Sequence, residues 1–193
     1  MTHEIPRAIT LAQFTIVFVL SGLMLTWALL RPEFGGDLEL GRTRLTVWPP
    51  FLLLIPALVL SLFRSTSQGI ANLAYLFWTA ALVTFVIHVY WGGFVFYDGL
   101  ADTFRNQGLW LAGANFALLA IWTLDTVLLW FAPEHRYLAI LHGSVRVLVF
   151  ALVGLDLIVG RSGPAHVLGY VFVGTIVAAW VVRYCRTNLQ LTA

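Results

Sequence analysis

The sequence predicts an all-α integral membrane protein, a single six-transmembrane-helix bundle over residues 1–193. Of these 193 residues, 60% are hydrophobic and 10% are charged, and the mean hydropathy is +0.88. An ordinary soluble domain carries about 25% charge. A helix that crosses a hydrocarbon core of about 30 Å needs about 20 apolar residues, and the sequence offers six such stretches. Because the bilayer gives backbone groups no partners, these stretches are expected to be helices and not open strands.

The six predicted helices are separated by residues that begin or end helices. Arg31 and Pro32 end the first helix, and Pro49 with Pro50 suit the first turn of the second. Pro133 stops the fourth helix, since proline cannot continue one. The predicted spans are 8–30, 47–63, 69–91, 108–131, 137–159 and 164–182.

Two connections are longer than a helix bundle needs. Residues 37–47 alternate polar and apolar side chains on both sides of Gly41, which predicts a small hairpin in the first loop. Residues 92–104 are rich in aromatic side chains and glycine. This second long loop is expected to lie partly in the membrane interface or to re-enter the bundle.

Most of the eight tryptophans lie near the ends of the predicted spans. An amphipathic indole at a span end sits at the level of the lipid head groups. We therefore expect these residues to anchor the helices and not to form a cofactor cage. They are Trp27, Trp48, Trp78, Trp91, Trp110, Trp130 and Trp180.

The arginines alone leave the orientation in the membrane undecided. With the N-terminus in the cytoplasm, five loop arginines lie inside and five outside, and basic residues are what the positive-inside rule counts. Five carboxylates in the outer loops lean toward this arrangement. We expect a bacterial inner membrane with both termini cytoplasmic. The inside set is Arg7, Arg64, Arg136, Arg183 and Arg186, and the outside set is Arg31, Arg42, Arg44, Arg105 and Arg161.

Composition also excludes several kinds of chemistry. All 11 basic residues are arginine, so no lysine can form a Schiff base or serve a P-loop. The single cysteine, Cys185, excludes an internal disulfide and a CxxC redox pair. The arginines do not cluster as a nucleic-acid groove requires, and hydrolase motifs are absent. We expect no nucleic-acid partner and no self-sufficient hydrolase.

Ionisable residues inside a span are costly and are the default place to look for function. Asp125 in the fourth span lies about 9 Å from its helix end, and His142 and Arg146 in the fifth lie about 7 and 13 Å from theirs. His142 and Arg146, four residues apart, share one helical face. An ion pair between Asp125 and Arg146 is expected. It would either lock the helices together or, with His142, form a proton or ion relay or a quinone or anion site; we favour the first.

A second set of polar residues lies toward the outer side. His88, Asp156 and His166 come from the third, fifth and sixth spans and can reach one depth. Two imidazoles and a carboxylate could hold a divalent metal, and His88 with His166 could ligate a haem b. The alternative is that all three are interfacial side chains that reach water.

Two short motifs resemble a known family. Residues 141–143 (LHG) open the fifth span, and residues 164–170 (PAHVLGY) open the sixth, which has Arg183 at its end. Together they resemble the first two helices of b561-type cytochrome membrane subunits. In that family the second histidine usually stands four residues before its Gly-Tyr, whereas His166 stands three before Gly169. The resemblance implies a role in membrane electron transfer.

Three function classes follow. The first is an integral-membrane subunit of a bacterial energy-transducing complex, with an anchor, assembly or electron-transfer role and other membrane subunits as partners. The second is a small transporter or channel that uses Asp125, His142 and Arg146 as its pathway. The third is a membrane-embedded metal or haem enzyme built on the outer set.

Overall fold

The computed structural model describes residues 8–31, 38–132, 136–160 and 162–191, and every regular element in these ranges is helical. Six of its helical segments are long and apolar enough to cross a membrane. The predicted all-α six-helix fold is therefore confirmed, and the chain is a multi-pass membrane protein. The elements are α1 (Leu11–Leu30), α2 (Leu38–Thr46), α3 (Trp48–Leu62), α4 (Gln68–Tyr90), the π-helix η1 (Trp91–Phe96), α5 (Leu100–Gln107), α6 (Leu109–Phe131), α7 (Arg136–Val159) and α8 (Pro164–Leu191).

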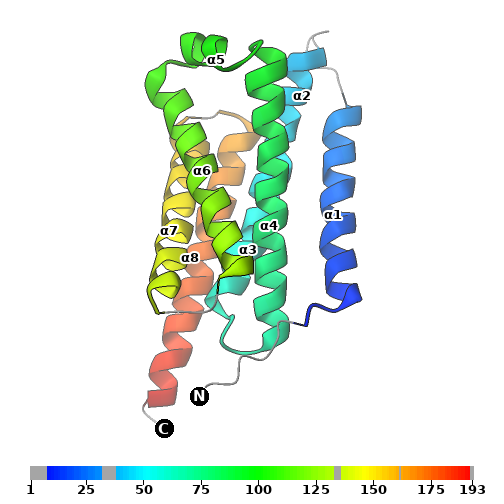
Figure 1. The fold of residues 1–193 in the computed structure, drawn as a ribbon. Helices are drawn as coiled ribbons and strands as arrows, with labels where there is room; N and C mark the ends of the chain where they lie inside the picture. Colours follow the sequence, from blue (N-terminus) through cyan, green and yellow to red (C-terminus); the bar gives the residue numbers. More distant parts are fainter. Residues whose placement is uncertain (1–7, 32–37, 133–135, 161, 192–193) are drawn as a thin grey trace.

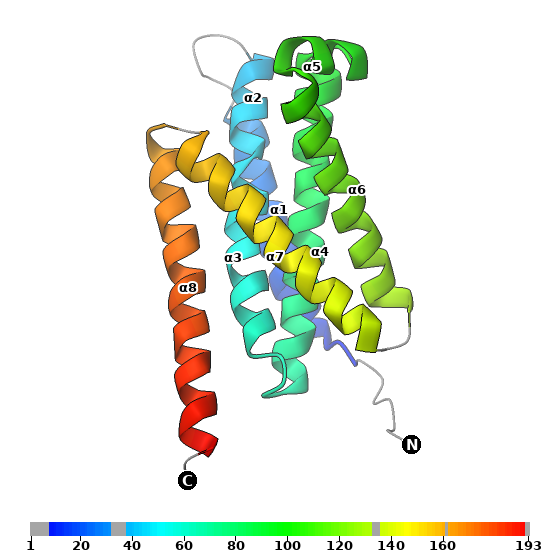
Figure 2. The same ribbon diagram turned by 90° about the vertical axis from the view of Figure 1, so that its left-hand side faces the viewer.

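The spanning helices alternate in direction, so α1 begins and α8 ends at the same end of the bundle (Figure 1). We call this the termini end, and we call the opposite end, across which Leu100–Gln107 lies, the α5 end (Figure 1). Helices α3 and α4 form the central hairpin. Helices α1 and α6 pack on α4, and α8 packs on α3. Helix α7 runs obliquely between α6 and α8, as Figure 2 shows.

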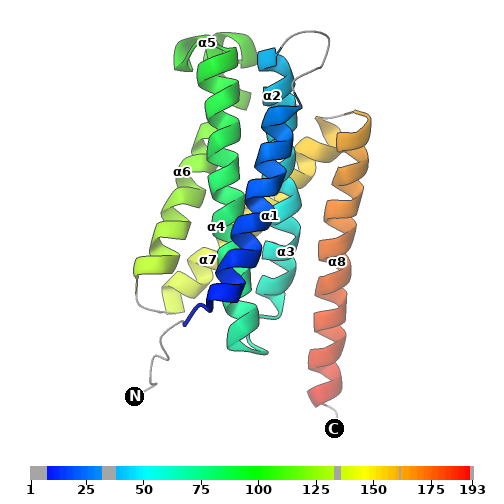
Figure 3. The same cartoon turned by 90° about the vertical axis from the view of Figure 1, so that its right-hand side faces the viewer.

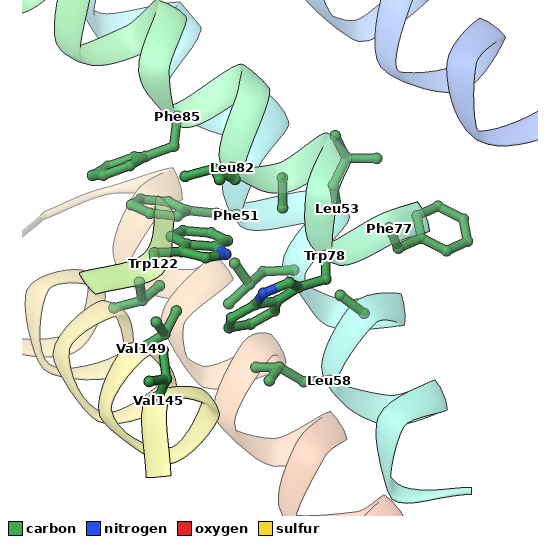
Figure 4. Packing of buried hydrophobic residues seen from close by; sticks show 14 of the residues in the cluster. Phe51, Leu53, Leu58, Phe77, Trp78, Leu82, Phe85, Trp122, Val145 and Val149 are labelled. Atoms are coloured by element: carbon green, nitrogen blue, oxygen red, sulfur yellow. The ribbon is translucent and has the colours of Figure 1, made fainter. Parts of the chain in front are cut away.

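One continuous apolar core joins these helices. Trp78 and Phe85 of α4 pack against Trp122 of α6, and Val149 of α7 lies beside them (Figure 4). The same cluster includes Val17 of α1 and side chains of α3 and α8. Because every spanning helix contributes to this cluster, the described residues have a shared core and not two separate ones.

Polar side chains fix the entry of α1 to the entry of α4. The Thr10 hydroxyl accepts a hydrogen bond from the backbone N–H of Gln13, whose side chain accepts one from Thr10, which is a capping box. Gln13 also donates to the carbonyl of Gly69 at 3.2 Å, and the buried Asn72 donates to the carbonyl of Ala8 at 3.0 Å. The capping box satisfies a backbone N–H group at the start of α1, where the helix leaves such groups unpaired, and the bonds to Gly69 and Ala8 join the two helix starts.

The hairpin predicted for residues 37–47 is wrong; residue 37 lies outside the described ranges, and Leu38–Thr46 is the helix α2. Its buried residues Gly41 and Leu45 are four apart, so they share one helical face. The guanidinium of Arg42 makes contacts with two other helices. Its Nε donates to the carbonyl of Leu29 in α1 at 3.4 Å, and its central carbon lies 5.1 Å from the ring centre of Trp91 in η1. Packing of one helical face thus overrides the local alternation.

The second long connection is folded and not an open loop. Its first half continues α4 as the π-helix η1, in which Gly92 and Gly93 are buried. A turn at Gly99, with φ of +117°, leads into α5. The buried Thr103 hydroxyl lies 2.9 Å from the carbonyl of Gly93 and 2.8 Å from that of Gly99, so α5 is held against η1.

Helix α8 is longer than predicted. It continues for nine residues beyond 182, to Leu191. The arginines there end the apolar run but do not end the helix, because the stretch contains neither glycine nor proline. As a result α8 projects past the other helices at the termini end (Figure 3).

Candidate functional site in the bundle interior

The central pair of the site is Asp125 of α6 and His142 of α7. One carboxylate oxygen of Asp125 lies 2.6 Å from Nδ1 of His142. Asp125 is 1% exposed and His142 is 7% exposed. Both stand in the half of the bundle nearer the termini end, six residues from the nearest end of their helices. Counting along the helices predicted Asp125 at a depth between His142 and Arg146, and in the structure its contact is with His142.

The hydrophobic pattern of the two helices explains why these polar groups point inward. On α7, His142 and Arg146 lie among buried residues that are otherwise valines, a glycine and a leucine, most of them three or four residues apart. On α6, Asp125 lies one turn from Trp122 and from Leu129, which are both buried. Burial of the apolar residues therefore carries the charged residues into the core.

A third helix completes the coordination of the carboxylate. The indole Nε1 of Trp78, on α4, donates to the second oxygen of Asp125 at 3.0 Å. Trp78 is 1% exposed. The expectation that Trp78 anchors the chain at the head groups is wrong, because this residue stands ten positions into α4, in the middle of the span. That mid-span position was the signal in the sequence that sets it apart from the tryptophans at span ends.

The predicted ion pair between Asp125 and Arg146 does not form. Arg146 stands one turn beyond His142 on α7, and both carboxylate oxygens of Asp125 already have partners. The guanidinium carbon of Arg146 instead lies 5.6 Å from the ring centre of Trp78. An aromatic face attracts a cation through its quadrupole. Arg146 thus contacts the cluster through Trp78, while it interacts with Asp125 only at longer range.

Sequence reasoning also missed Trp122, the neighbour of this cluster. Its ring centre lies 4.9 Å from that of Trp78, with the planes tilted by 44°. Trp122 is 1% exposed, and its Nε1 has no hydrogen-bond partner within the part of the chain that the structure describes. The two tryptophans therefore differ sharply: one indole N–H holds a carboxylate, and the other is buried without a partner.

The outer residues His88, Asp156 and His166 are not gathered into one site. His88 of α4 shares a 3.2 Å hydrogen bond with the Thr46 hydroxyl, and His166 of α8 shares one of 3.1 Å with the Tyr170 hydroxyl. Helix α3 stands between α4 and α8 (Figures 2 and 3). Within the described ranges, no group of three His, Cys, Asp or Glu side chains is placed to hold a metal ion.

The interior cluster has the chemistry of a proton-sharing pair inside a rigid frame. When Asp125 is ionised and His142 carries a proton on Nδ1, this N–H donates to the carboxylate, and the Trp78 N–H fixes the orientation of the carboxylate. Charge-assisted bonds of this kind are about twice as strong as neutral ones. In the arrangement described, the cluster is closed to water, since each of its residues is at most 8% exposed.

The b561-type motifs place their histidines in different settings. His142, in residues 141–143, is bonded to Asp125, whereas His166, in residues 164–170, lies near the start of α8 beside Tyr170. No protein-family model matches the chain, and no curated protein or solved structure shows significant similarity to it.

Proposed function

We propose that this chain is an integral-membrane subunit of a larger energy-transducing complex in a bacterial inner membrane, where it serves as an anchor or assembly component. The observation that carries the proposal is a contrast between the interior and the exterior of the bundle. The interior ionisable groups have their partners within the chain, whereas much of the apolar outer surface is not covered by the chain. Inside, Asp125, His142 and Arg146 find their contacts within the chain. Outside, α1 buries only Val17 and Ala28 among its 20 residues.

Outward-facing glycines support a partner and not lipid alone. At Gly22, Gly113, Gly143 and Gly174, on four different helices, no described atom beyond the glycine's own turn of helix lies within 4 Å of where a Cβ would stand. Glycine costs a helix about 1 kcal/mol relative to alanine. In membranes small residues permit the close approach of another helix. Their open faces are the surfaces on which helices of other subunits would fit.

We further propose that both termini are cytoplasmic. The described loop arginines are shared equally between the two ends, with Arg64, Arg136, Arg183 and Arg186 at the termini end and Arg31, Arg42, Arg44 and Arg105 toward the α5 end. The described carboxylates outside the core all lie toward the α5 end; they are Glu39, Asp98, Asp102 and Asp156. Because the arginines are balanced, the basic residues that the positive-inside rule counts do not decide the orientation, and the one-sided carboxylates are what supports the proposal.

A phenylalanine scan of the four open glycines tests the subunit role. Each variant is tagged, extracted from its native membrane in mild detergent and examined for a stoichiometric second chain. At least one of the four substitutions is expected to remove that chain while the melting temperature of the tagged protein stays unchanged. Leu111→Phe, which adds bulk at the 53% exposed Leu111 on a different face of α6 from Gly113, is the control. Purification without a second chain, or retention of it in all four variants, contradicts the proposal.

A second candidate function, a small proton-coupled transporter, is favoured by one observation. The 2.6 Å contact between Asp125 and His142 is buried between helices, where a carboxylate and an imidazole can exchange a proton. Such intramembrane pairs mark proton pathways in transporters. Purified protein in vesicles would then carry protons, Asp125→Asn would abolish the flux, and Asp102→Asn, in α5 and outside the spanning helices, would leave it intact. Vesicles without flux above background exclude this function.

A further inference from the structure

A groove at the termini end separates the end of α3 from the last turns of α8. It has a volume of about 410 Å³ and is lined by Leu62, Trp180, Arg183, Tyr184, Thr187 and Asn188. It lies apart from the interior cluster. Any ligand bound there is consequently independent of the function proposed above.

The groove lies at the boundary between hydrocarbon and head groups. Leu62 is the last residue of its apolar span. Arg183 stands 19 residues after Pro164 on α8, which corresponds to about 28 Å along the helix axis. The hydrocarbon core is about 30 Å thick. The part of the groove at Leu62 therefore faces acyl chains, and the part beyond Arg183 faces the head groups.

The lining joins apolar surface to positive charge. Tyr184 stacks on Trp180 with ring centres 5.8 Å apart and planes 18° from parallel. The Arg183 side chain has no carboxylate partner among the residues that the structure describes. The Thr187 hydroxyl is already committed, since it donates to the carbonyl of Arg183 at 3.1 Å. Arg183 and the Tyr184 hydroxyl thus remain as donors at the mouth of the groove.

The charge around the groove selects an anion. The described charges exposed at this end are arginines, whereas the described carboxylates outside the core lie toward the α5 end. Guanidinium groups bind phosphate oxygens with two parallel hydrogen bonds. Basic residues beside a membrane attract anionic lipids.

We propose that this groove binds an anionic phospholipid. The lipid phosphate accepts hydrogen bonds from Arg183 and from the Tyr184 hydroxyl, and an acyl chain lies along the apolar wall at Leu62. The bound lipid would fill the groove between Leu62, at the end of α3, and the last turns of α8.

The test measures lipid binding to the whole purified chain. The protein in detergent is titrated with phosphatidylglycerol or phosphatidylcholine, and bound lipid is counted by native mass spectrometry. Phosphatidylglycerol is expected to bind at one site, and Arg183→Gln is expected to weaken it by roughly fivefold or more. Tyr184→Phe should weaken it less, because the aromatic stack with Trp180 stays in place. Leu62→Trp, which fills the groove, should also reduce binding.

Arg186→Gln is the matched control. Arg186 is an exposed arginine on the same helix, three residues further on, and does not line the groove. Equal losses in the Arg183 and Arg186 variants would mean diffuse attraction to the arginine-rich end and would overturn the proposal. Equal binding of phosphatidylcholine would overturn it too. So would full competition by millimolar inorganic phosphate, because the groove would then be a site for a free anion.

Discussion

The carboxylate of Asp125 is held between two donors from different helices, with His142 Nδ1 at 2.6 Å and Trp78 Nε1 at 3.0 Å. Three helices therefore meet at one side chain. Breaking one partner of a buried pair leaves the other charge or dipole without compensation, whereas removing both partners does not. The stability of the bundle should reflect this asymmetry.

A double-mutant cycle on Asp125 and His142 should show strong coupling. Asp125→Leu alone is expected to cost about 3 to 5 kcal/mol, because it strands His142 and the Trp78 N–H. The double variant Asp125→Leu with His142→Leu should cost clearly less than the sum of the two single changes. Thermal denaturation in detergent gives the stability of the wild type, the two single variants and the double variant. Additive losses would show that the two side chains do not stabilise each other.

The two buried tryptophans should respond differently to the same substitution. Trp78→Phe removes a hydrogen bond to a carboxylate, worth about 1.5 to 3 kcal/mol. Trp122→Phe removes an N–H that has no partner in the described part of the chain, so it should cost less and lose only packing. Each variant serves as the control for the other, since both replace a core indole by a phenyl ring. Equal destabilisation would contradict the assigned hydrogen bond.

The contact between α7 and α8 should tolerate no side chain at Gly169. A Cβ there would lie 2.9 Å from the Cβ of Leu157 and 3.1 Å from its backbone carbon. Gly169→Ala is expected to destabilise the protein by about 1 to 3 kcal/mol through overpacking. Gly174→Ala, on the same helix but with open space around it, should be neutral or stabilising. A neutral Gly169→Ala would mean that α7 and α8 are less closely packed.

Labelling of cysteines tests the proposed orientation. Cys185 is exposed near the termini end and is the only cysteine in the sequence. In sealed right-side-out vesicles, a membrane-impermeant maleimide should label Cys185 only after permeabilisation. Asp102→Cys in a Cys185→Ser background should react with the maleimide without permeabilisation, because α5 lies at the other end of the bundle. The reverse pattern would place both termini outside.

The hydrophobic pattern predicted most of the helix boundaries closely. The predicted span 69–91 corresponds to Gln68–Tyr90, and 137–159 corresponds to Arg136–Val159. Apolar length decides these ends, and apolar length is visible in a sequence. Residues 37–47 could not be predicted in the same way, because α2 is stabilised by packing on η1 and by contacts of Arg42 with α1.

The sequence predicted how deep the residues of the candidate site lie in the bundle, but not which of them contact each other. Counting residues placed Asp125, His142 and Arg146 near one level, and the structure has Asp125 and His142 in contact. Counting does not give the rotation of a third helix about its axis. Trp78 enters from α4, takes one carboxylate oxygen and offers its ring to Arg146, which is why the expected ion pair is absent.

The mass of the intact assembly tests the central claim most directly. The chain has a mass of 21.5 kDa. Native mass spectrometry of the tagged protein, extracted from its own membrane in mild detergent, should give an assembly whose mass requires at least one different chain in fixed ratio. A spectrum that contains only the 21.5 kDa chain or its whole multiples, with or without lipid, would contradict the role as a subunit.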